Sequence, residues 1–507
     1  MTAGETDIIV VGGGGSGLTA AIFAAKAGAK VVLLEKHSEV RGSTGLSIGS
    51  ITASGTALQG KAGINDSADA HFEDMGRMAE KFSGPERAAR DNFVLRRILV
   101  DNVADSVAWL TSLGIVMFGP MPEPPHRVPR MHNILPNSRA YIHFLKREAE
   151  RAGVDIRVNA PVTGLMEDGG RITGVIWDEK GRQQKLGARR AVILASGDYS
   201  SSPQWKARFR NDLGNIDGVN TTNTGDGQAM GEALGAVITF GELMYGPNLR
   251  FMPPARPSLL QKLPPWPWLT RAMRLSLNRL PSWLLRPFIL QFVTTYLSPE
   301  PSLFEAGAIL VNAQGRRFAD ERRDPNIAIA DQPGKVAWIL FDDALAKRFS
   351  KWPDFVSTAP GVAYAYIPDY QRTRPDICHR GKTPAELAAA MGVPAAALEA
   401  ELAAYNANAV ADGRKPLLPG TLHALGPVSS RIVLTEGGLS VNAHHQVVRS
   451  DGSVIAGLYA VGSAGQGGLL LDGHGHHLAW AFTSGRLGGL HAARIAQSHQ
   501  REEAHAQ

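Results

Sequence analysis

Three glycines near the N-terminus carry the most specific chemical signal in the sequence. Gly12, Gly14 and Gly17 match the G-x-G-x-x-G spacing, between an apolar run at residues 7–11 and an alanine-rich stretch compatible with a helix. The first glycine permits the sharp turn, the second lets a pyrophosphate approach the backbone, and the third lets helix and strand pack closely. Free N–H groups and the helix dipole would bind the phosphates. The chemistry expected here is dinucleotide binding.

The elements around the glycine turn support that interpretation. Gly28 can end the helix, and residues 31–34 (VVLL) are predicted to form the next buried parallel strand, which completes a β-α-β unit. Glu35 follows this strand, where an acid accepts hydrogen bonds from an adenosine ribose and disfavours a 2′-phosphate. The alternative is a glycine-rich turn without a ligand, but strand, helix and acid all stand at the expected spacing.

Length and composition predict an ordered chain of more than one structural unit. The chain has 507 residues, of which 44% are apolar and 20% charged, enough to bury a large core. Cys378 is the only cysteine, so no internal disulfide can form. The first seven residues lack a basic region followed by an apolar run, so no secretory signal is predicted and a cytoplasmic location is expected.

Positive charge is concentrated in one segment. The formal net charge is +6, and residues 243–299 contain seven cations and no acid, so the rest of the chain has a net charge of −1. A partner attracted by this charge should contact that segment, and no nucleic-acid partner is predicted.

A helix within the basic segment, over residues 267–281, would have an apolar stripe on one side, arginines on the other and tryptophans at its ends. Such a helix can lie on an anionic bilayer, so residues 256–297 are predicted to contact the inner face of the membrane. Packing of the helix on the protein, with its arginines in solvent, is an equally open alternative. Arginines and prolines exclude a transmembrane span. The stripe is Leu269, Met273, Leu277 and Leu280, the arginines are Arg271 and Arg274, and the tryptophans are Trp266, Trp268 and Trp283.

Further motifs give the chain a family resemblance. The segments VVGGGGSGLTAA, LLEK, RGSTGLSIGS, AVILASG, NTGDG, GAILVNAQGRRFADE and GLYAVG occur in the order and approximate spacing of the fumarate reductase and 3-ketosteroid dehydrogenase type of flavoprotein. The resemblance implies an α/β fold, with a Rossmann-type FAD-binding domain built on a parallel sheet and an inserted α+β capping domain. Residues 1–240 and 425–507 would form the FAD-binding domain, and residues 241–424 the capping domain.

The glycine motif and the resemblance together predict the cofactor-binding residues. Hydroxyl groups could instead cap loops, and Asp226 could be a turn residue. Ser463 stands where the family often has a glutamate, and residues 41–50 contain no histidine, so the FAD is expected to be bound non-covalently. The predicted residues are Gly12, Gly14, Gly15, Ser16, Gly17, Glu35, Lys36, Ser43, Thr44, Ser47, Val162, Ala195, Ser196, Gly197, Asp226, Gly462, Ser463, His477 and Leu478.

The positions that bind a dicarboxylate in the family are changed here. In the fumarate reductases a histidine and an arginine hold the substrate carboxylates, and the resemblance places Leu434 and Asp472 at those positions. An acid in place of the arginine argues against fumarate as the substrate. The nearest equivalent of the family's catalytic arginine is Arg323, for which a surface ion pair is an equally open interpretation.

The run LLLDGHGHHLAW at residues 469–480 replaces the usual substrate and flavin segment. The resemblance aligns Gly475 with a glycine whose N–H polarises a substrate ketone, and three histidines surround it. Their imidazoles suit proton transfer near neutral pH, whereas their spacing is not that of a usual zinc site, so no metal is predicted. The predicted catalytic residues are His474, Gly475, His476, Arg323 and Tyr296.

The predicted reaction is the interconversion of C–C and C=C next to the carbonyl of a hydrophobic, cyclic ketone of steroid or cyclohexanone type. A base would remove the proton next to the carbonyl while a hydride passes to flavin N5, or the reverse. The alternatives are a reductase of an unsaturated carboxylic acid, of fumarate or urocanate type, and a flavin electron-transfer subunit. The chain has one dinucleotide motif, so no nicotinamide site is predicted. The electron partner stays open, and a quinone is one candidate.

Overall fold

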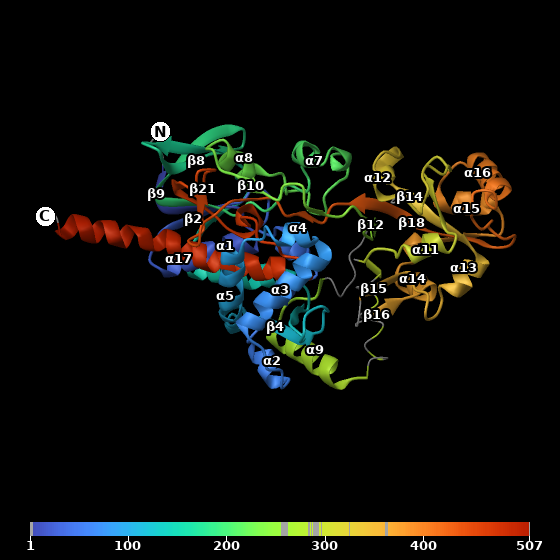
Figure 1. Ribbon diagram of the computed structural model, residues 1–507, viewed down its shortest axis with the longest axis horizontal. Helices are drawn as coiled ribbons and strands as arrows, with labels where there is room; N and C mark the ends of the chain where they lie inside the picture. The colour runs from blue at the N-terminus through green and yellow to red at the C-terminus, as the bar shows by residue number, and fades with distance from the viewer. Residues whose placement is uncertain are drawn as a thin grey trace.

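A large sheet in one half of the molecule and a smaller sheet in the other organise the chain (Figure 1). The computed structural model describes residues 4–254, 262–281, 284, 286, 290, 294–295, 297–323, 325–359 and 363–505. We call residues 4–245 and 434–505 the body, and residues 246–254 and 297–431 the cap. Each half has its own buried hydrophobic core.

The body is built on a mostly parallel sheet. Its strand order is β21-β22-β8-β9-β1-β2-β6, with β7 beside β8, and β6, β2, β1, β9 and β22 run parallel. All four residues of β2 are buried, as expected for a parallel strand covered on both faces. The strands are β1 (Gly4–Val11), β2 (Val31–Leu34), β6 (Asp155–Arg157), β7 (Val162–Asp168), β8 (Arg171–Glu179), β9 (Arg182–Leu194), β21 (Gln446–Val448) and β22 (Val454–Ala460).

Two helices pack on this sheet, and two more pack on those helices. Helices α1 (Gly15–Lys26) and α17 (His476–His505) pack on each other, α5 (Phe93–Ser112) packs on α17, and α6 (Arg139–Arg151) packs on α1. The predicted β-α-β unit is therefore confirmed as β1, α1 and β2. The carboxyl ends of β1 and β2 and the N-terminus of α1 meet at one edge of the sheet.

Smaller elements complete the body. Between residues 66 and 113 the chain forms three successive helices, the last of which is α5. The remaining elements are α2 (Ala57–Lys61), α3 (Ala68–Phe82), α4 (Pro85–Ala88), α7 (Pro203–Phe209), α8 (Asp226–Glu232), the sheet of β3 (Ser50–Thr52), β5 (Met131–Leu135) and β4 (Val116–Met121), and the pairs β10 (Ile238–Thr239) with β20 (Gly438–Leu439) and β11 (Met244–Tyr245) with β19 (Leu434–Thr435).

The cap is an antiparallel sheet with surrounding helices, so the predicted α+β insertion is confirmed (Figure 1). Strand β18 pairs with β12 up to Arg431, so the cap sheet extends beyond residue 424, the predicted end of the domain. The strands are β12 (Asn248–Phe251), β13 (Ile309–Asn312), β14 (Ala337–Asp342), β17 (Cys378–Gly381), β18 (Leu422–Arg431) and the pair β15 (Ser357–Ala359) and β16 (Ala363–Ala365). The helices are α11 (Ser302–Glu305), α12 (Pro325–Ile329), α13 (Asp343–Arg348), α14 (Ile367–Thr373), α15 (Pro384–Met391) and α16 (Ala395–Asn408).

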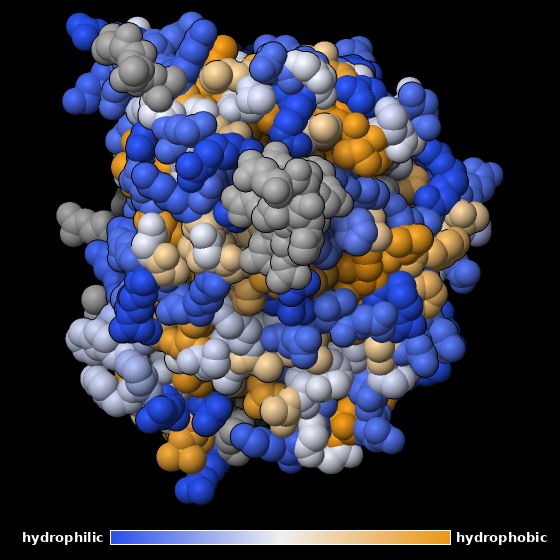
Figure 2. All heavy atoms as spheres, turned by 90° about the vertical axis from the view of Figure 1, so that its left-hand side faces the viewer, coloured by the Kyte–Doolittle hydropathy of each residue, from blue (hydrophilic) through white to orange (hydrophobic). Residues whose placement is uncertain are grey.

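The predicted helix of the basic segment is α9 (Pro267–Arg279), which lies against β4 and β5 of the body (Figure 1). Within the described ranges, no helix combines the length and the apolar character needed to cross a membrane. The end of the molecule that carries the C-terminus of α17 is mostly hydrophilic, with smaller hydrophobic areas between the polar side chains (Figure 2).

Candidate active site

A cavity of about 1310 Å³ is lined by both body and cap. It runs from the glycine turn of the body, past the segment after Leu471, to β12 in the cap. One end therefore lies at the edge of the parallel sheet where a dinucleotide is expected, and the other end lies between the two halves of the protein.

The glycine turn and the end of β2 form the first wall. Residues 12–16 line the cavity, and the N-cap residue of α1, Gly14, has no side chain to satisfy the helix N-terminus. The Gly13 amide donates to Glu35 Oε2 at 2.6 Å, and the Gly15 amide donates to Thr44 Oγ1 at 3.1 Å. These contacts fix the turn and hold the Glu35 carboxylate at the cavity.

A polar wall follows along the cavity. Ser43 Oγ accepts hydrogen bonds from Asn220 Nδ2 and Asn223 Nδ2, both at 3.0 Å. Lys36 Nζ lies 2.8 Å from Asp226 Oδ2, at the start of α8. The two asparagines were not predicted: Asn223 opens the NTGDG motif, of which only Asp226 was assigned to the cofactor, and Asn220 lies outside the motifs of the resemblance.

The structure brings nearly all of the predicted cofactor residues to this cavity. Gly17 and Gly462 do not line it: Gly17 packs on the turn, and Gly462 lies behind it, where its amide donates to Ser484 Oγ at 2.9 Å. The lining residues are Gly12, Gly14, Gly15, Ser16, Glu35, Lys36, Ser43, Thr44, Ser47, Val162, Ala195, Ser196, Gly197, Asp226, Ser463, His477 and Leu478.

Two carboxylates and a histidine meet where the segment after Leu471 enters the cavity. Burial, and then the negative charge of Glu436, raise the pKa of Asp472 to about 7, although Ser83 Oγ donates to it at 2.9 Å. His477 Nε2 lies 2.9 Å from Glu436 Oε1. Burial favours the neutral ring, but Glu436 and the neighbouring acids outweigh it and raise the pKa of His477. This group can therefore hold and exchange protons.

The three neighbouring histidines lie in different surroundings. His474 lines the cavity, and its Nδ1 lies 2.6 Å from Glu123 Oε1, a contact that raises the pKa of His474. His476 is fully buried and does not line the cavity. Its Nδ1 contacts the backbone oxygen of Asp472 at 2.7 Å, so the ring is held away from the space that a substrate could enter.

Of the two predicted cap residues, Arg323 does not line the cavity. Its side chain is 86% exposed and lies 3.7 Å from the Asp320 carboxylate, so it fits the surface ion pair rather than catalysis. Tyr296 lies outside the described residues. A different arginine, Arg250 on β12, lines the cavity, and its Nε is buried without a hydrogen-bond partner in the described structure. The sequence feature that could have pointed to Arg250 is its place in the basic segment at residues 243–299, which contains no acid to pair with it.

Comparison with known proteins identifies the family. The sequence profile of the family described as FAD binding domain matches residues 7–260 and 300–471. The chain belongs to the FAD binding domain family.

Proteins with two different activities are similar to the chain in sequence. The NADH:fumarate oxidoreductase of Klebsiella pneumoniae (strain 342) is 25% identical over 515 residues, which cover 97% of this chain and 48% of that protein, so the chain spans about half of that relative. The 3-oxosteroid 1-dehydrogenase of Mycobacterium tuberculosis (strain ATCC 25618 / H37Rv) is 24% identical over 620 residues, which cover 97% of this chain and 99% of that protein. Among solved structures, the open conformation of a flavocytochrome c3 fumarate reductase superposes on this chain with a TM-score of 0.71 and 25% sequence identity. The matched region covers 97% of this chain and 79% of the flavocytochrome chain. The resemblance, the fold class and FAD as the cofactor are confirmed.

The glycine turn of this FAD binding domain has the shape that the cofactor requires. A Cβ atom on Gly12 would lie 2.4 Å from Ala195 O, and one on Gly17 would lie 1.9 Å from Gly12 O, so the chain packs on itself there. A Cβ atom on Gly14 would meet only Gly42 Cα, at 3.7 Å, so this side of the turn is open to the cavity. The residues present therefore fit the pyrophosphate and adenosine of FAD. Non-covalent attachment stays a prediction.

Proposed function

We propose that the chain is an FAD-dependent oxidoreductase that interconverts C–C and C=C bonds next to the carbonyl of a hydrophobic, cyclic ketone. The supporting observation is the Asp472 carboxyl group, which lines the cavity beside Glu436 and has no ion pair among the described residues. Such a group can exchange a proton with the carbon next to a carbonyl. Two neighbouring acids also repel a dicarboxylate, whereas a neutral ketone meets no such repulsion.

Apolar side chains support a hydrophobic substrate. They line the cavity from both halves of the protein, and burying a ring system against them contributes roughly 25 cal/mol for each Å² of apolar surface. They include Phe251, Met252 and Leu297 from the cap and Leu243, Leu434 and Leu471 from the body.

The protein residues have separate tasks in the proposed reaction. Bound flavin supplies the hydride acceptor or donor. Asp472 takes or returns the proton next to the carbonyl, and the Glu436–His477 pair holds a further proton beside it. The Gly475 backbone lies at the cavity, where its amide can polarise the ketone, and the cap excludes water.

Arg250 favours a second candidate, a reductase of an unsaturated carboxylic acid. Its guanidinium lines the cavity, burial lowers its pKa, and no described carboxylate pairs with it. A substrate carboxylate could form that ion pair. The similarity to the NADH:fumarate oxidoreductase of Klebsiella pneumoniae supports this candidate.

Flavin absorbance distinguishes these candidates. We expect saturated cyclic ketones to bleach the oxidised flavin, or cyclic enones to reoxidise the reduced flavin without oxygen, because Asp472 faces a neutral carbonyl compound. Fumarate and urocanate should have no effect. Reoxidation by the acids alone would overturn the ketone proposal in favour of the second candidate. No response to any compound would favour an electron-transfer subunit.

An arginine substitution sharpens this test. Arg250→Gln should change ketone turnover by less than about threefold, whereas an enzyme that binds a carboxylate through Arg250 should lose at least about 30-fold in kcat/KM for the acid. Arg210→Gln is the matched control, because Arg210 also lines the cavity but is paired with Asp212 at 2.6 Å.

We also propose that the outward face of α9 contacts an anionic membrane surface. Leu269, Met273 and Leu277 of the predicted apolar stripe are partly buried, as the alternative of packing on the protein requires, whereas its fourth member, Leu280, is exposed. The outward side exposes Trp268, Leu275 and cationic groups instead, a composition suited to a bilayer interface. This contact would bring the cavity near a quinone as electron partner.

Vesicle binding tests the membrane contact. The chain should sediment with phosphatidylserine vesicles at low salt, and Trp268→Glu with Leu275→Glu should reduce the bound fraction about tenfold, because charge on this face opposes burial in the interface. Val410→Glu is the control, since Val410 is equally apolar and 76% exposed in the cap. Equal binding by all of these variants, or none by the unaltered chain, would contradict the proposal.

A further inference from the structure

We propose that His71, His126 and His476 form a binding site for a divalent transition-metal ion of the zinc type. One ring nitrogen of each histidine lies within 4.8 Å of the other two, and all three residues are buried. The residues come from three parts of the body: His71 from α3, His126 from the loop between β4 and β5, and His476 from the first residue of α17. Imidazole nitrogen is a preferred ligand of zinc, copper and nickel.

Outer hydrogen bonds orient the rings of His71 and His476 so that their Nε2 atoms face each other, within hydrogen-bond distance. His71 Nδ1 contacts Ser54 Oγ at 3.2 Å, and His476 Nδ1 contacts the backbone oxygen of Asp472 at 2.7 Å. The Nε2 atoms of these two rings lie 3.1 Å apart, and the Nε2 atom of His126 is buried without a partner among the described residues. Outer hydrogen bonds of this kind orient histidine ligands toward a metal.

The spacing is close to that of a tetrahedral site. Zinc–nitrogen bonds of 2.0–2.1 Å at tetrahedral angles separate the nitrogens by about 3.4 Å. The His71 and His476 nitrogens lie 3.1 Å apart, close to this spacing, and all three nitrogens lie within 4.8 Å of one another, so the separations that involve His126 would have to shorten when the ion binds. The fourth position would hold water.

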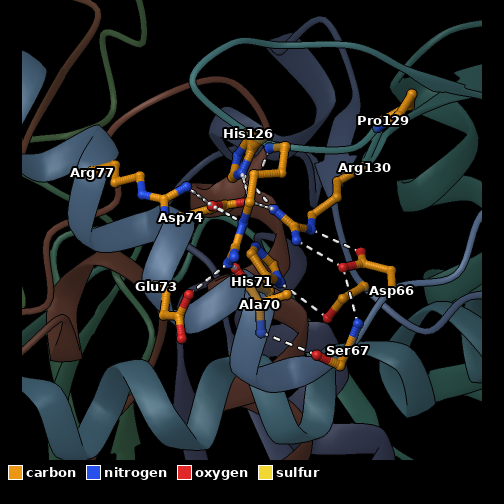
Figure 3. A network of polar contacts seen from close by, with 12 residues as sticks. Asp66, Ser67, Ala70, His71, Glu73, Asp74, Arg77, His126, Pro129 and Arg130 are labelled. Carbon is orange, nitrogen blue, oxygen red and sulfur yellow. Dashed lines mark hydrogen bonds and ion pairs between the residues drawn. The ribbon is translucent and has the colours of Figure 1, made fainter.

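The charged groups around His126 are compatible with a bound metal cation, because the arginine there is paired with two carboxylates. Arg130 Nη1 contacts His126 Nδ1 at 2.9 Å, and the Arg130 guanidinium is neutralised by Asp66 at 2.7 Å and Asp74 at 2.5 Å (Figure 3). Asp74 Oδ2 lies 3.9 Å from His126 Nδ1. Arginine has only N–H donors, so His126 Nδ1 accepts from Arg130 here and the ring proton lies on Nε2. Binding a metal through Nε2 requires the other tautomer, with Nδ1–H turned away from Arg130 and toward Asp74, the nearby carboxylate that could accept it.

Burial favours the neutral form of all three imidazoles, which is the form that binds a metal. The ion would tie α3, the β4–β5 loop and the start of α17 together, next to the segment that carries Asp472.

This cluster differs from the group of three histidines in residues 469–480, for which the sequence predicted no metal. The neighbouring histidines His474, His476 and His477 do not converge: His474 contacts Glu123 and His477 contacts Glu436. Only His476 of the three joins the cluster, and its partner His71 stands 405 positions away along the chain.

Metal content tests the inference directly. FAD-loaded protein, stripped with a chelator, incubated with zinc and passed through gel filtration, should retain one zinc per chain by mass spectrometry. Cobalt at the same site should give the visible absorption of a tetrahedral complex, and zinc should abolish it. Less than about 0.1 equivalent of zinc, or a cobalt spectrum that zinc does not change, would overturn the proposal; both readouts use the unaltered chain.

Substitutions locate the ion. His126→Asn and, separately, His71→Gln should each weaken zinc binding at least about 100-fold, while FAD content and circular dichroism report that the variants are folded. The matched control is His445→Asn, because His445 is equally buried and both of its ring nitrogens lack partners in the described structure. Equal zinc retention by all three folded variants would place the ion elsewhere and contradict the proposal.

Discussion

Gly14→Val is expected to abolish FAD binding while the chain stays folded. The Gly14 backbone has φ −81° and ψ −171°, an extended conformation that valine adopts without strain. Its added side chain would stand in the cavity, where the second glycine of the motif lets the pyrophosphate approach the backbone. We expect FAD affinity to fall at least about 1,000-fold, which corresponds to about 4 kcal/mol. The ratio of flavin absorbance to protein after gel filtration measures this loss, and circular dichroism reports the fold.

The other glycines of the turn would not give a clear result. Valine at Gly12 or Gly17 would collide with the backbone oxygens of Ala195 and Gly12, so loss of FAD there could follow from misfolding. Gly60→Ala serves as the control, because Gly60 lies in α2 with no atom within 4 Å of its added Cβ. A folded Gly14→Val protein that keeps its yellow colour would show that the pyrophosphate lies elsewhere.

The FAD end of the site could be predicted from the sequence because its determinants are local. The turn at Gly12 to Gly17, the strand at residues 31–34 and Glu35 lie within one continuous β-α-β unit, and hydrophobic periodicity specifies such a unit. The inserted cap was also predicted, but its end was not, because β18 continues as one strand to Arg431 without a composition change at residue 424.

The substrate end depends on contacts between distant segments. Glu436 meets His477, and Arg250 reaches the cavity only because β12 pairs with β18. No local pattern encodes these contacts. Conversely, Arg323 was predicted from motif order, but its exposed position depends on how the cap packs. His476 was predicted beside the substrate because of its neighbours in sequence, yet it starts a helix whose first residue turns its ring into the body.

Asp472→Asn is expected to lower kcat by about 10²- to 10⁴-fold, the range typical of a general acid or base. Asparagine keeps the size of the side chain, and its oxygen can still accept the hydrogen bond from Ser83, but it cannot take a proton from carbon. FAD binding should be unchanged and KM should change little. Single-turnover flavin reduction by the substrate that the absorbance screen identifies measures the effect on the chemical step.

The surroundings of the neighbouring acids single out Asp472. Glu436 is engaged by His477 on one oxygen and by Gln466 on the other, and His474 is held by Glu123. Asp472 Oδ2 accepts only the Ser83 hydrogen bond, and Oδ1 has no partner among the described residues, so an oxygen remains available to a substrate. Ser83→Ala, the control, should lower kcat by no more than about tenfold, because it removes one hydrogen bond and leaves the carboxyl group. If Asp472→Asn retained more than a tenth of the unaltered rate, proton transfer would have to be assigned to His477 through Glu436.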